Sequence, residues 1–187
     1  TKISMEKANN IIYNQNQVLR RHLSQLDTFE TLSVFVDMKD FQKPDFNTED
    51  AERLKPFEDF LEPIQKFKDK PCVYFIEIVT GNPKEIRAAY EQLDGKNKAG
   101  LRKIDEKIFD TQCLYVGKSQ KSIVHRLKVH FGYKNTSEKG LQLLHWAIPL
   151  HLKLKIHIYC FPTELDFLLP SYEKVLNKEL KPLIGYL

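Results

Sequence analysis

Short stretches of the chain are rich in β-branched and aromatic residues, and these stretches predict β-strands. Two of them also alternate apolar and polar positions with the period of two that a half-buried strand shows. The expected strands are residues 32–36, 72–79, 113–116 and 154–160. The first is short and precedes a loop at Pro44, so the sheet is expected to consist of the other three.

Other stretches repeat their apolar residues at helical spacing, which predicts amphipathic helices. These are residues 6–26, 48–67, 83–93, 123–131, 141–148 and 163–180. Pro56 and Pro63 are expected to interrupt the second helix, and Pro170 to kink or split the last. The charged stretch 94–107 predicts a loop or a short helix.

The order of these elements predicts an α/β (α+β) domain over residues 68–187, with a small, mainly antiparallel, three-stranded sheet flanked by helices. Residues 1–67 are expected to form a helical accessory segment. A length of 187 residues suits one domain with a small appendage. The sequence contains no internal repeat.

Composition narrows the class of protein. With 42% hydrophobic residues, 11% aromatic residues and seven glycines, the chain is neither collagen-like nor a low-complexity sequence. It has no apolar run of about 18 residues and no signal-peptide pattern, so we expect a cytoplasmic protein without a membrane span. Its three cysteines are widely spaced, which predicts reduced, buried thiols rather than a disulfide framework or a zinc site.

The net charge of +4 is unevenly distributed along the chain. Residues 1–67 carry 9 basic and 12 acidic side chains, whereas residues 68–187 carry 20 and 13. A basic C-terminal part suits a polyanion such as nucleic acid, although it also suits an ordinary solubilising surface. The lysines that would follow a phosphate backbone are Lys121, Lys128, Lys134 and Lys139. The acidic N-terminal segment is a candidate docking site for a protein partner.

The glycine, lysine and serine at positions 117–119 suggest a phosphate-binding loop, but the spacing excludes one. Such a loop needs an earlier glycine where this chain has Gln112. A zinc site built from His145, His151, His157 and Cys160 lacks the usual ligand spacing. Trp146 is expected in the core, with stacking on a nucleic-acid base as the alternative.

A second pattern accounts for more residues. Two half-motifs, Cys72-Val73-Tyr74 and Leu114-Tyr115-Val116-Gly117, are followed by Lys118, Arg126, His130 and Glu173. In order and spacing, this set resembles the GIY-YIG nuclease superfamily over roughly residues 70–187. The chain departs from that pattern at Cys72, where glycine is usual, and at Gly185, where asparagine is common. The two tyrosines are also about forty residues apart, which implies an insertion after the first strand.

The resemblance implies a Mg²⁺-dependent endonuclease that cleaves DNA, with Mn²⁺ as a substitute ion and RNA left open as a substrate. Glu173 would hold the ion, because one carboxylate suffices if water and phosphate oxygens complete the shell. Arg126 would stabilise the phosphate with its planar, charged fork.

The same resemblance assigns the water molecule and the protons to Tyr74, Tyr115, Lys118 and His130. A free tyrosine has a pKa of about 10, so either phenol needs nearby cations to act as a base, and the choice between them stays open. A non-catalytic nucleic-acid-binding module and a protein-interaction domain are the alternative functions.

Overall fold

The computed structural model describes residues 29–41, 51–93, 110–133 and 140–185, together with seven isolated residues between 13 and 24. Side chains are not described for residues 51–54. Most of the helix predicted at 6–26 lies outside the described residues. So do the stretch 94–107 and two of the predicted phosphate-binding residues, Lys134 and Lys139.

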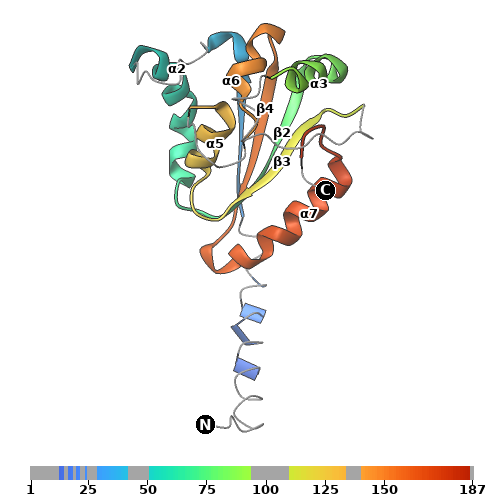
Figure 1. Cartoon of the computed structure of the whole chain (residues 1–187). Coiled ribbons are helices and arrows are strands. Elements are labelled where there is room, and N and C mark those ends of the chain that lie inside the picture. The colour runs from blue at the N-terminus through green and yellow to red at the C-terminus, as the bar shows by residue number, and fades with distance from the viewer. Residues whose placement is uncertain are drawn as a thin grey trace, which may run out of the picture.

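The protein has an α+β fold in which helices flank a four-stranded antiparallel sheet (Figure 1). The strand order is β1-β4-β2-β3, and every neighbouring pair is antiparallel. The strands are β1 (Glu30–Asp37), β2 (Cys72–Thr80), β3 (Cys113–Ser119) and β4 (Lys153–Cys160).

The predicted count of three strands was therefore wrong. β1 comes from the segment expected to be an accessory helical layer, and it pairs with β4 along all eight of its residues. The alternation of Leu32, Val34 and Val36 explains why, because these side chains pack on the main core only if β1 joins the sheet.

Helices and short 3₁₀ turns connect the strands. They are η2 (Met38–Asp40), α2 (Ala51–Leu61), η3 (Glu62–Phe67), α3 (Pro83–Glu91), α5 (Ile123–Phe131), α6 (Leu143–Trp146), η4 (Ile148–Leu150), η5 (Thr163–Leu168) and α7 (Leu169–Leu180).

The prolines have three different effects on these helices. Pro56 lies inside α2 without ending it, contrary to the prediction, because α2 is fixed by the burial of Phe57 and Phe60. Pro63 starts η3 instead. Pro170 lies in the first turn of α7, so the predicted split of the last helix is confirmed; a first turn tolerates proline because its N–H groups have no intrahelical acceptor.

Helices lie on both faces of the sheet (Figure 1), which separates two apolar clusters. On one face, Tyr74 and Ile76 of β2 pack in the main core with residues of α2, η3, α5 and α6. On the other face, α7 and η5 cover Val73 in a smaller cluster that includes Phe161 and Leu169. Residues of β2 therefore alternate between a layer that contains α5 and a layer that contains α7.

The C-terminal segment covers the start of β3, which is an edge strand. The backbone N–H groups of Leu183 and Ile184 donate to the carbonyls of Cys113 and Leu114, at 2.8 and 2.9 Å. The last described residues are thereby fixed beside the sheet.

Candidate active site

Helix α5 presents two of the predicted site residues to the sheet. The side chain of Ser122 caps its N-terminus by accepting from the backbone N–H of His125, and Gly132 ends it with a φ of 96°. Arg126 and His130 are four residues apart, so they lie on the same side of this short helix. His130 is fully buried.

Strands β2 and β3 bring the two predicted tyrosines together. Tyr74 lies directly opposite Gly117, and Tyr115 lies opposite Ile76 on the same face. The two tyrosine rings are 6.1 Å apart between centroids. A Cβ atom at position 117 would lie 2.6 Å from Oη of Tyr74 and 2.7 Å from Cε1 of Tyr115, so the tyrosines require glycine there.

These elements assemble a polar cluster, which we call the tyrosine cluster: Tyr74, Tyr115, Arg126 and His130. Oη of Tyr74 is hydrogen-bonded to Nε2 of His130 at 2.7 Å, and the Tyr115 and His130 rings are 4.7 Å apart. Burial lowers the pKa of Arg126, but its electrostatic interactions and hydrogen bonds with both tyrosines outweigh burial and raise that pKa above its ordinary value. The cluster therefore holds a permanent cation against two phenols.

Tyr74 contacts two nitrogen-bearing side chains of α5. Arginine has only donors, so the tyrosine oxygens accept from Arg126. Oη of Tyr74 also shares a hydrogen bond with Nε2 of His130, where a phenol can either donate or accept. Tyr74 thus lies between a cation and an imidazole.

The other two predicted residues meet on the opposite face of the sheet. Lys118 lies opposite Val73, so its side chain points to the layer that contains α7. There, Nζ of Lys118 donates to Oε2 of Glu173 at 2.5 Å. The two side chains are 34% and 26% exposed, which makes this ion pair more accessible than Tyr74 and His130, both at 0%.

The six predicted residues therefore form two groups rather than one. The groups adjoin at β3, because Gly117 contacts the tyrosine cluster and the next residue, Lys118, holds Glu173. Sequence reasoning missed this division, although the signal was present. Tyr115 and Lys118 are three residues apart on one strand, and an odd spacing places side chains on opposite faces.

Glu173 is the predicted metal ligand. No group of three His, Cys, Asp or Glu residues in the described part of the chain could hold a metal ion. One oxygen of Glu173 is bonded to Lys118, so Oε1 is the oxygen that remains for an ion. A single carboxylate oxygen fits Mg²⁺ or Mn²⁺ only if water and phosphate oxygens supply the rest of the shell.

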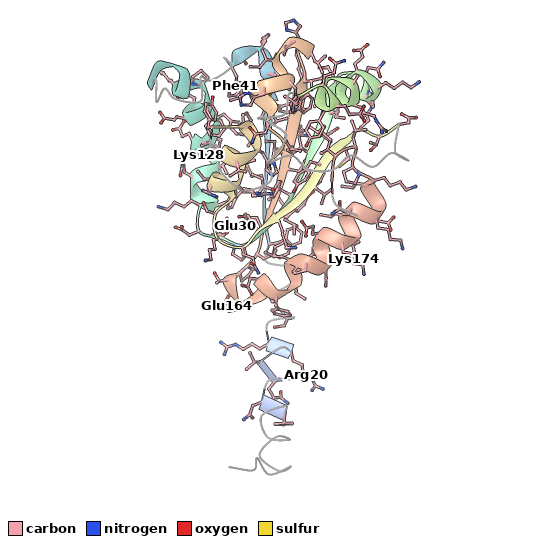
Figure 2. The ribbon with its side chains drawn as sticks, viewed as in Figure 1. Arg20, Glu30, Phe41, Lys128, Glu164 and Lys174 are labelled. Carbon is pink, nitrogen blue, oxygen red and sulfur yellow. The ribbon has the colours of Figure 1, made fainter. Side chains whose placement is uncertain are left out.

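The remaining predicted residues have simpler surroundings. Lys121 is exposed in the turn before α5, and Lys128 is half-buried on α5. Figure 2 shows Lys128 on the α5 side of the molecule, away from Lys174 on α7. Trp146 is a core residue, as expected, with Nε1 donating to the carbonyl of Leu141. The three cysteines are free and buried, which confirms the thiol prediction.

Comparisons of the chain with protein-family models, with curated proteins and with solved structures find no match in any of the three. Within the described ranges, no helix combines the length and the apolar character needed to cross a membrane.

Proposed function

We propose that the protein is a divalent-metal-dependent endonuclease of the GIY-YIG type that hydrolyses DNA phosphodiester bonds. The observation that carries this proposal is the tyrosine cluster. Four residues chosen for their order along the sequence, from β2, β3 and α5, are in mutual contact in the fold. Tyrosines, an arginine and a histidine are the groups needed to take a proton from water and to stabilise a phosphate.

Within this proposal, Tyr74 is the better candidate for the general base. With the His130 proton on Nδ1, Nε2 accepts the proton of Tyr74, and Arg126 stabilises the phenolate that remains after the transfer. That phenolate then takes a proton from the attacking water. Tyr115 shares Arg126 and orients the same water or the phosphate.

Glu173 would hold the metal ion, and the ion, when bound, supplies positive charge near the phosphate. Lys118 fixes the Glu173 carboxylate by an ion pair and adds a second cation at the edge of the sheet. A phosphate at the Gly117–Lys118 backbone would adjoin both groups of residues, because each group contacts this part of β3.

The test is nicking of supercoiled plasmid with Mg²⁺, with Mn²⁺ or with chelator. We expect Glu173→Gln and Arg126→Lys to lower the rate at least about 100-fold, as loss of one group that stabilises developing charge usually does. Glu179→Gln is the matched control, because Glu179 is an exposed acid on the same helix. Wild-type rates for Glu173→Gln, or cutting that persists in chelator, would contradict the proposal.

A second candidate is a nucleic-acid-binding module without turnover. The observation that favours it is the full burial of Tyr74 and His130, because a base must reach its water. This candidate predicts DNA binding that weakens with salt, and no cleavage with either ion. Cleavage by the wild-type chain separates the two: in the first case it occurs and Tyr74→Phe abolishes it, whereas in the second it does not occur and Tyr74→Phe leaves DNA affinity unchanged.

A further inference from the structure

The face of the sheet that α7 covers continues beyond that helix over β1, β4 and β2. We call the part that no other described element covers the open sheet face. Its outward side chains are Ser33, Phe35, Phe75, Lys155 and His157, and Tyr159 lies at its border with the α7 cluster. The strand register aligns Ser33, His157 and Phe75 in one row across three strands. Phe35 and Lys155 are paired in the next row, and Tyr159 lies in the row that also contains Val73.

Aromatic rings are concentrated on this face, where an antiparallel sheet facing water normally has polar residues. Phe35 is 67% exposed, the highest value for a large apolar side chain in the described ranges. The rings of Phe75 and His157 are stacked, with centroids 4.4 Å apart and planes 17° apart. Tyr159 lies nearly parallel to Phe75, at 6.3 Å and 19°.

The charges beside these rings leave one lysine for an anionic partner. On this face Lys153 and Lys155 balance Asp37 and Glu77 in number. Asp37 is paired with Lys153, and Glu77 is hydrogen-bonded to His157. Lys155 instead places its ammonium 5.0 Å from the centre of the Phe35 ring, beside the most exposed ring of the face.

The polar groups of the face are largely engaged with one another. Ser33 Oγ is hydrogen-bonded to Nδ1 of His157 at 2.9 Å, and Nε2 of His157 is bonded to Oε2 of Glu77 at 2.8 Å. These bonds leave the rings and the Lys155 ammonium as the main contact groups. A partner would therefore be bound by stacking and by charge, with little reading of base edges or of a 2′-hydroxyl.

From these observations we infer that the open sheet face binds single-stranded DNA, with one unpaired base stacked on Phe35 and the adjacent phosphate beside Lys155. Flat bases suit exposed aromatic rings, and a phosphate suits the Lys155 ammonium beside the Phe35 ring. A duplex does not suit this face, because its bases already stack on one another. Binding here needs neither a metal ion nor the tyrosine cluster.

The test measures fluorescence anisotropy of a labelled dT12 oligonucleotide with the full chain, in chelator so that no cleavage occurs. We expect Phe35→Ala to weaken binding roughly 5- to 150-fold, the range for loss of one stacked base. Lys155→Gln should reduce the slope of log affinity against log salt by about 0.7, the value for one phosphate contact to a single strand. Phe167→Ala, at an exposed phenylalanine of η5 outside this face, is the matched control and should bind like wild type.

Phe35→Trp adds a readout that a purely structural role would not change. It should bind at least as tightly as wild type, and its added indole fluorescence should be quenched by dT12. A rU12 strand should bind no more tightly than dT12.

The inference is overturned if Phe35→Ala binds dT12 like Phe167→Ala, or if the Phe35→Trp indole is not quenched. It is also overturned if Phe35→Ala weakens binding of a blunt duplex as much as binding of dT12, or if rU12 binds more than five-fold more tightly than dT12. Failure of plasmid nicking would affect only the proposed nuclease, because dT12 binding is measured without metal.

Discussion

Substituting Gly117 with alanine tests whether the tyrosine cluster is as tightly packed as its geometry indicates. The new Cβ would lie 2.6 Å from Oη of Tyr74, so the hydroxyl would have to move by at least several tenths of an ångström. Tyr74 has no free space because it is fully buried, and the movement would break its 2.7 Å bond to His130. Overpacking costs about 1–3 kcal/mol and the lost hydrogen bond about 0.5–1.5 kcal/mol. We expect the free energy of unfolding to fall by about 2–4 kcal/mol.

The assay is urea unfolding followed by far-UV circular dichroism and by the fluorescence of Trp146. For a chain of this length, the same loss lowers Tm by about 4–16 °C. Gly185→Ala is the control, because its Cβ would meet Pro182 Cγ at 3.3 Å and Asn177 Oδ1 at 3.6 Å, and it should cost less than about 1 kcal/mol.

A double-mutant cycle with Tyr74→Phe identifies the atoms responsible. Tyr74→Phe already removes the hydrogen bond to His130, so that loss is counted in both single variants and only once in the double variant. The double variant should therefore be less destabilised than the sum of the two by about 1 kcal/mol. Additive effects, or a Gly117→Ala protein as stable as Gly185→Ala, would refute the reasoning.

Two further predictions concern buried groups. Burial raises the pKa of Tyr133 to about 12, whereas the tyrosines of the unfolded chain titrate near about 10. The unfolded chain therefore loses this proton first. As a result, the free energy of unfolding should be level below about pH 10 and fall as the pH rises toward 12. In Tyr133→Phe that fall should be shallower, and an unchanged pH profile would contradict the assignment. All three thiols are buried; in addition, a hydrogen bond to Cys160 and burial raise the pKa of Cys72, and burial raises that of Cys113 to about 12. A disulfide reagent at pH 8 should therefore react with none of the three thiols in the folded protein and with all three in urea. A thiol that reacts rapidly without urea would contradict this prediction.

The sequence predicted the strands well and their assembly less well. The positions of β2, β3 and β4 followed from local composition, because β-branched and aromatic residues favour strands wherever they pair. The partner of β1 did not follow, because pairing with β4 joins residues 116 to 130 positions apart and depends on the whole sheet. The prolines show the same limit: Pro170 marked the start of α7, whereas the effect of Pro56 depended on the burial of its neighbours.

The candidate site was predictable as a set of residues and not as a geometry. Order and spacing selected Tyr74, Tyr115, Arg126 and His130, and these four residues are in contact. The separation of Lys118 and Glu173 from them follows from the alternation of β3, which an inventory of motif residues ignores. No sequence motif indicated the open sheet face, because its aromatic rings come from three strands that are far apart in the sequence.

The backbone hydrogen bonds from Leu183 and Ile184 to β3 make the two edges of the sheet unequal. The start of β3 is blocked by its own C-terminal segment, and the rest contains Gly117 and Lys118, which pair poorly with a foreign strand. β1, the other edge, has eight residues without glycine, proline or lysine. Within the described sheet, two copies that joined through β1 would each use up the receptive edge, so assembly by strand addition would stop at a pair instead of growing into a fibre.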